Sequence, residues 1–146
     1  MPRFAADRIL LAPVGDVWTF LAEPYHLSDW WPGISGIEPD RRGLAPGARW
    51  QIRGTEMSAQ PMFGPGLLRR PGAAGMLLVT DVVPGRRIAF HLVNEHVEAE
   101  IELEPRGEDR TRVGLVVDAP WWAMRRSFPH RALARLYELV QTAAGA

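Results

Sequence analysis

Between residues 14 and 50 the chain reads VGDVWTFLAEPYHLSDWWPGI (14–34) and then LAPGARW (44–50), and this stretch decides the fold. Its first apolar residues recur at helical spacing behind Pro13, which suits the first turn of a helix, and Pro24 ends the pattern. A second short helix is expected over 26–30, and a strand over 48–53. Two short helices that lead into a curved antiparallel sheet are typical of a fold with an apolar pocket. The order therefore predicts a small-molecule site.

Length and composition limit the class of protein. The 146 residues, 47% hydrophobic and 23% charged, suit one domain over 1–146 with one core. The formal net charge is zero and the charges alternate in sign, so we expect neither nucleic acid nor an anionic membrane as a partner. The chain has no run of about 18 apolar residues, and charges interrupt its start, so we expect a cytoplasmic protein without membrane insertion. Either a monomer or a homodimer is compatible with the sequence.

Several chemistries are excluded by the residues that the chain lacks. It has no cysteine, which excludes disulfides and thiol nucleophiles, and its 17 basic residues are all arginine, which excludes a lysine Schiff base. The four histidines are scattered without metal-binding spacing. The sequence also contains no nucleophile elbow, P-loop or dinucleotide fingerprint. We therefore expect no metal and no cofactor.

The central strands can be paired from their alternation. A turn at Asn94-Glu95 places one wholly apolar face toward the core and a charged face toward solvent. The expected inward pairs are Leu92 with Val97, Phe90 with Ala99 and Ile88 with Ile101, and the outward pairs are His91 with Glu98 and Arg87 with Glu102. A last strand over 111–117 continues the sheet, with Arg112 beside Glu104.

Two further segments complete the chain. An apolar face over 121–142 predicts a C-terminal helix across the inner face of the sheet, with a kink or break at Pro129. Residues 55–75 form an insertion that is long and unusually apolar for a loop. This insertion is interpreted either as a lid over the pocket or as a surface excursion that packs on its own domain.

Four segments carry a family resemblance, namely APVGDVWTFLAEPYHLSDWWPGI (12–34), LAPGARW (44–50), VVPGRRIAFHL (82–92) and TRVGLVV (111–117). They resemble the START-like superfamily, in particular its polyketide cyclase/dehydrase-type and lipid-transport-type members. The resemblance covers the chain except for the insertion. It implies an α+β helix-grip fold, in which an antiparallel sheet of about seven strands wraps around a long C-terminal helix and the cavity between them takes hydrophobic ligands.

Two polar residues are candidates for catalysis. Asp81 lies in an apolar strand, so its pKa would be raised and it could act as a general base if it faced inward. Arg53 could orient an enolate or carboxylate oxygen, provided that a bulge or twist brings it into the pocket. The alternatives are a satisfied surface carboxylate and a solvated strand arginine.

A larger set of apolar and aromatic residues is expected to contact a ligand. These residues are Trp50, Ile52, Phe63, Leu67, Val79, Phe90, Leu92, Ala99, Ile101, Leu115, Phe128 and Tyr137. The leading hypothesis is a domain that binds a lipid or polyketide-like molecule. The alternatives are a cyclase, aromatase or dehydratase that needs no metal or nucleotide, and a regulatory protein that docks a partner through its apolar loop. Because the fold hosts all of these activities, it cannot choose among them.

Overall fold

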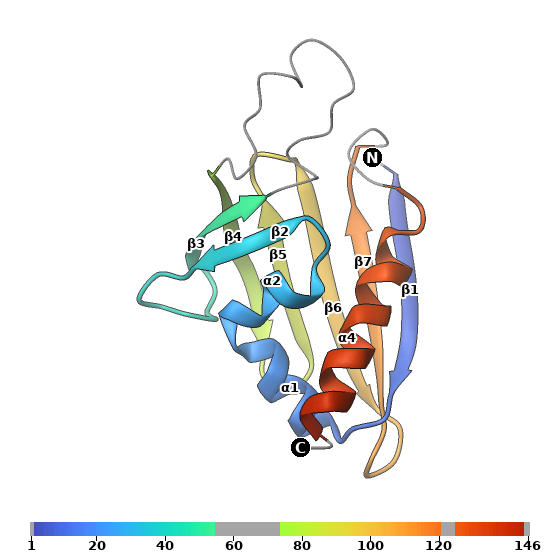
Figure 1. Ribbon diagram of the computed structural model, residues 1–146. Helices are drawn as coiled ribbons and strands as arrows, with labels where there is room; N and C mark the ends of the chain where they lie inside the picture. The colour runs from blue at the N-terminus through green and yellow to red at the C-terminus, as the bar shows by residue number, and fades with distance from the viewer. Residues whose placement is uncertain (1, 55–73, 121–124, 145–146) are drawn as a thin grey trace.

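A curved, seven-stranded antiparallel sheet forms the body of the computed structural model, which describes residues 2–54, 74–120 and 125–144 (Figure 1). The strands are β1 (Arg3–Leu10), β2 (Ile34–Glu38), β3 (Arg49–Gly54), β4 (Ala74–Val83), β5 (Arg87–Leu92), β6 (Val97–Pro105) and β7 (Thr111–Asp118). Their order across the sheet is β1-β7-β6-β5-β4-β3-β2. The helices are α1 (Val14–Ala22), the 3₁₀ turn η1 (Pro24–His26), α2 (Leu27–Trp30) and α4 (Phe128–Ala144). The expected α+β helix-grip fold is confirmed.

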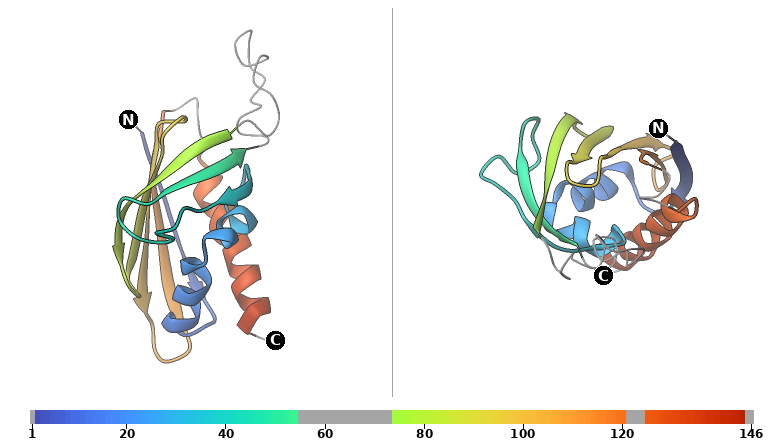
Figure 2. Two further views of the ribbon diagram at one scale, coloured as in Figure 1. Left: turned by 90° about the vertical axis from the view of Figure 1, so that its left-hand side faces the viewer. Right: turned by 90° about the horizontal axis from the view of Figure 1, so that it is seen from above.

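Seen from above, the sheet curls around α1, η1 and α2, which we call the helical corner, while α4 stands beside β1 (Figure 2). The helical corner forms where the sequence requires it, because Pro13 precedes α1 and Pro24 starts η1. Trp30 and Trp31 at the end of this corner are 2% and 0% exposed. The corner therefore reaches into the core with its largest side chains.

The central hairpin has the register that its alternation predicts. Leu92 pairs with Val97, Phe90 with Ala99 and Ile88 with Ile101, and all six side chains are buried. The outward pairs and the pairing of Glu104 with Arg112 are also as expected. Strict alternation fixes this register, since a slip by one residue would turn the apolar face to water.

The C-terminal helix corrects the sequence-based prediction. It begins at Phe128 instead of Trp121, because residues 125–127 form a turn and Pro129 lies in the first helical turn. Proline at that position needs no hydrogen-bond partner for its nitrogen, so the helix starts there, which agrees with the expected break at Pro129. Residues 121–124 and the insertion up to residue 73 lie outside the described residues.

The packing of α4 against the core can be tested by substitution. Replacing the fully buried Leu136 by alanine should destabilise the fold by about 2–5 kcal/mol, because it removes apolar contacts and leaves a cavity. Leu139→Ala on the same helix is the control, since that side chain is only partly buried and should cost about 1 kcal/mol. Urea unfolding of both variants measures the difference. Equal losses would contradict this placement of the helix.

Candidate functional site

A small apolar pocket lies between the helical corner and the middle of the sheet. Its lining residues are Leu21, Pro24, Leu27, Trp30, Leu44, Trp50, Leu77, Val79, Ile88, Phe90 and Ile101. None of these described residues belongs to α4, so the expected position between the sheet and the C-terminal helix is corrected to a position under the helical corner. The cavity volume of about 20 Å³ is little more than one water molecule needs.

A β-bulge in β4 decides which side chains face the pocket. The pairing shifts register between Val79 and Asp81, so that Val79 pairs with Phe90 while Asp81 pairs with Ala89. Plain alternation from the inward-facing Val79 would also turn Asp81 inward. The extra residue reverses the parity, and Val82 packs on the core instead.

The two catalytic candidates consequently lie away from the pocket and from each other. Asp81 forms an ion pair with Arg87 on the outer face, and Arg87 also reaches Glu100 at 3.5 Å. The hydrogen bond that Arg87 donates to the Asp81 carboxylate raises the pKa of Arg87. Arg53 is exposed on β3, whose inward residues are Trp50 and Ile52. The inward orientation on which both catalytic roles depended is absent from the structure.

Four of the predicted ligand contacts line the pocket, namely Trp50, Val79, Phe90 and Ile101. The others are distributed through the chain: Ile52, Leu92, Ala99, Leu115 and Phe128 are buried core residues outside the lining, and Phe63 and Leu67 lie outside the described residues. Tyr137 is partly buried, with the guanidinium carbon of Arg8 4.5 Å from its ring centroid.

Sequence reasoning missed the contribution of the helical corner and of one loop. None of Leu21, Pro24, Leu27 and Trp30 was predicted as a ligand contact, although they supply one wall of the pocket. The apolar residues of these short helices could have indicated this wall, since short helices bury such residues against the sheet.

The loop between β2 and β3 holds Leu44 against the pocket. Asp40 accepts hydrogen bonds from the backbone N–H groups of Arg42 and Arg49, both at 2.9 Å. The indole Nε1 of Trp50 donates to the carbonyl oxygen of Gly43 at 2.8 Å. Backbone donation, chiefly from Arg49, lowers the pKa of Asp40. These bonds fix one side of the pocket from a single loop.

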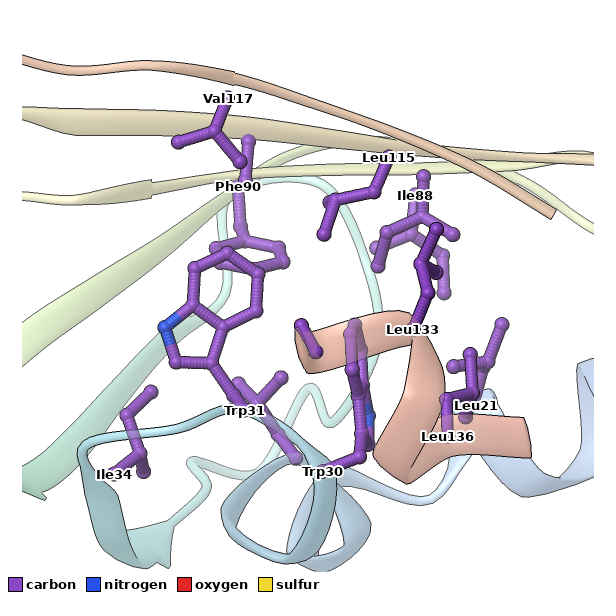
Figure 3. Close-up of a cluster of buried hydrophobic side chains, with 14 of the residues drawn as sticks. Leu21, Trp30, Trp31, Ile34, Ile88, Phe90, Leu115, Val117, Leu133 and Leu136 are labelled. Carbon is purple, nitrogen blue, oxygen red and sulfur yellow. The ribbon is translucent and has the colours of Figure 1, made fainter. Parts of the chain in front are cut away.

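Trp31 lies next to the pocket at the centre of an aromatic cluster. Its ring meets those of Trp30 and Phe90 (Figure 3) and that of Phe128 edge to face, with centroid distances of 5.7, 5.2 and 5.0 Å, respectively. Its indole nitrogen is buried and has no hydrogen-bond partner in the described structure. Leaving a buried donor unsatisfied costs about 1–3 kcal/mol, so this group is unusual in an otherwise well-packed core.

Residues 2–54, 74–120 and 125–144 contain no cluster of histidine and carboxylate side chains that could hold a metal ion. Within the same ranges, no helix has the length and apolar character needed to cross a membrane.

Comparison with known proteins identifies the family. Residues 11–135 match the family described as Activator of Hsp90 ATPase homolog 1-like protein. The chain belongs to this family. The Activator of Hsp90 ATPase homolog 1-like family is part of the START and polyketide cyclase superfamily, so the resemblance seen in the sequence is confirmed. No curated protein matches the chain significantly.

Solved structures share the fold at low sequence identity. Protein NE0264 from Nitrosomonas europaea is 20% identical with a TM-score of 0.71, and the match covers 99% of this chain and 97% of that one. Protein CV1439 from Chromobacterium violaceum is 17% identical with a TM-score of 0.67, over 97% and 99% of the two chains. DynU16, from the dynemicin biosynthetic locus, is 15% identical with a TM-score of 0.63, over 97% of this chain and 48% of its own length. At these identities the matches show the fold that this chain shares with them.

The loop that carries Leu44 should be sensitive to acid through Asp40. Because the pKa of Asp40 is lower in the folded chain than its ordinary value of 3.8, its carboxylate stabilises the fold above that value and loses this effect as the pH falls through the folded pKa. Asp40→Ala should therefore lower the melting temperature at pH 7, and the loss should shrink toward pH 3. The exposed Asp109→Ala is the matched control. A pH-independent loss for Asp40→Ala would contradict this role.

Proposed function

We propose that the chain binds a hydrophobic small molecule, lipid-like or polyketide-like, in the pocket under the helical corner. The observation that carries this proposal is the uniformly apolar lining, contributed by the helical corner, one loop and four strands. Binding pockets of this kind are lined mainly by apolar and aromatic side chains.

Entry of a ligand requires the pocket to widen, since a volume of about 20 Å³ cannot hold a ligand of ten carbon atoms. The walls differ in how easily they can move. Strands β3 to β6 are held by backbone pairing along their length, whereas α2 is a single helical turn and the loop that carries Leu44 is held by three side-chain hydrogen bonds. The proposed movement is therefore a displacement of the helical corner and of this loop from the sheet.

Burial of the ligand supplies the free energy for this opening. Removing 250 Å² of apolar ligand surface from water contributes about 6 kcal/mol at about 25 cal/mol per Å². Part of this gain offsets the cost of opening and of losing ligand freedom. The affinity is thus expected to rise with the length of an apolar ligand until the pocket is filled.

Catalysis is the less supported alternative. A cyclase, aromatase or dehydratase would need ionisable side chains that converge on its substrate. Among the described lining residues, none is ionisable, and the surface network of Asp81 and Arg87 lies on the other face of the sheet. The geometry therefore favours binding over catalysis.

Filling the rim of the pocket should block binding. Leu44 is partly buried in its loop, so the larger indole of Leu44→Trp can occupy the pocket without disturbing the strands. We expect 2-undecanone, titrated by calorimetry, to bind the parent protein with a negative heat-capacity change and to bind Leu44→Trp at least about tenfold more weakly.

Leu11→Trp is the matched control, because Leu11 is 43% exposed and lies outside the lining. It should bind 2-undecanone as the parent protein does. The proposal fails if neither 2-undecanone nor 2-methyl-1-undecene, an alkene of the same shape, binds, or if Leu44→Trp binds 2-undecanone as tightly as the control does.

A further inference from the structure

The unpartnered indole N–H of Trp31 indicates which class of ligand the pocket binds. Trp31 is 0% exposed, and its Nε1 has no acceptor in the part of the chain that the structure describes. Buried donors in folded proteins are almost always paired. We propose that this N–H is a recognition group that donates a hydrogen bond to an uncharged oxygen of the ligand. This inference rests on the proposed function.

The position of Trp31 connects its N–H to the pocket. Its ring contacts those of Trp30 and Phe90, and both of these residues line the pocket. In Figure 3 the indole nitrogen lies on the edge of the ring that points away from Leu133 and Leu136 of α4, and also away from Leu21 and Ile88 of the pocket lining. A ligand that displaces the helical corner from β5 would therefore separate the two rings between which Trp31 is packed, and its oxygen could reach the nitrogen.

One indole of the pocket wall is already engaged. The Nε1 of Trp50 donates to the carbonyl oxygen of Gly43, so this indole is not free for a ligand. At the far end of the core, the hydroxyl group of Thr111 donates to the carbonyl oxygen of Ala12. Two fully buried donor atoms have no acceptor in the described residues, Trp31 Nε1 and Arg87 Nε, and Arg87 lies on the outer face of the sheet beside Asp81.

The surroundings decide the chemistry of the acceptor. A carboxylate or phosphate would bring a full charge into an interior where, among the described lining residues, no cation can pair with it. A single neutral donor does not compensate for that loss of hydration. A ketone, ester or ether oxygen needs only one donor, so the ligand class is an apolar molecule with one neutral acceptor oxygen, not a free fatty acid or phospholipid headgroup.

A matched pair of ligands tests the hydrogen bond. 2-Undecanone and 2-methyl-1-undecene have the same shape but differ in whether a C=O or a C=CH₂ group faces the protein. The parent protein should bind the ketone about fivefold more tightly than the alkene, which is the effect of one net hydrogen bond. Undecanoate should bind more weakly than the ketone.

The variant Trp31→Phe keeps an aromatic ring and removes the N–H, so it should bind both molecules with equal affinity. Trp18→Phe, at a partly buried site on α1 outside the lining, is the control and should retain the fivefold preference. Equal binding of ketone and alkene to the parent protein would overturn the inference while leaving the proposed function intact. Failure of both to bind would instead overturn the proposed function.

A second measurement covers the case in which Trp31→Phe does not fold. In the parent protein labelled with ¹⁵N, the indole N–H proton of Trp31 should shift downfield when the ketone binds and should not do so with the alkene. The indole of Trp18, which lies outside the pocket lining, serves as the internal reference. Bound ketone without a downfield shift at Trp31 would overturn the inference.

Discussion

The packing of Trp31 is the interaction on which the rest of the structure depends. Its ring lies against Trp30 of the helical corner, Phe90 of the sheet and Phe128 of α4, so one side chain joins three parts of the fold. Edge-to-face aromatic pairs of this kind add about 0.5–1.5 kcal/mol each beyond the burial of their area. The cluster holds the helical corner close to the sheet, and this closeness explains why the pocket is small.

The sequence was sufficient for the parts of the fold that strict alternation determines. The register between β5 and β6 followed from Leu92, Phe90 and Ile88, because a one-residue slip would expose all of them. The outward orientation of Asp81 could not be predicted from alternation. A bulge adds one residue to β4 and reverses the parity of the strand, and the local sequence LVTDVV contains no glycine or proline to mark it.

The candidate site was predicted only in part, for a related reason. The strand residues Trp50, Val79, Phe90 and Ile101 were identified because alternation places them inward. The opposite wall depends on how the helical corner docks, which is a long-range contact that no local pattern encodes. The family resemblance suggested a cavity under the C-terminal helix, whereas α4 packs against β1 and β7 and the pocket lies under the helical corner.

The most direct test is to locate a bound ligand by intermolecular nuclear Overhauser effects from 2-undecanone to labelled methyl groups. The structure predicts contacts with methyl groups of Leu77, Val79 and Ile88, which line the pocket. Contacts with Val113, Leu136 and Val140 instead, all buried in the core outside the lining, would place the ligand elsewhere and contradict a site under the helical corner.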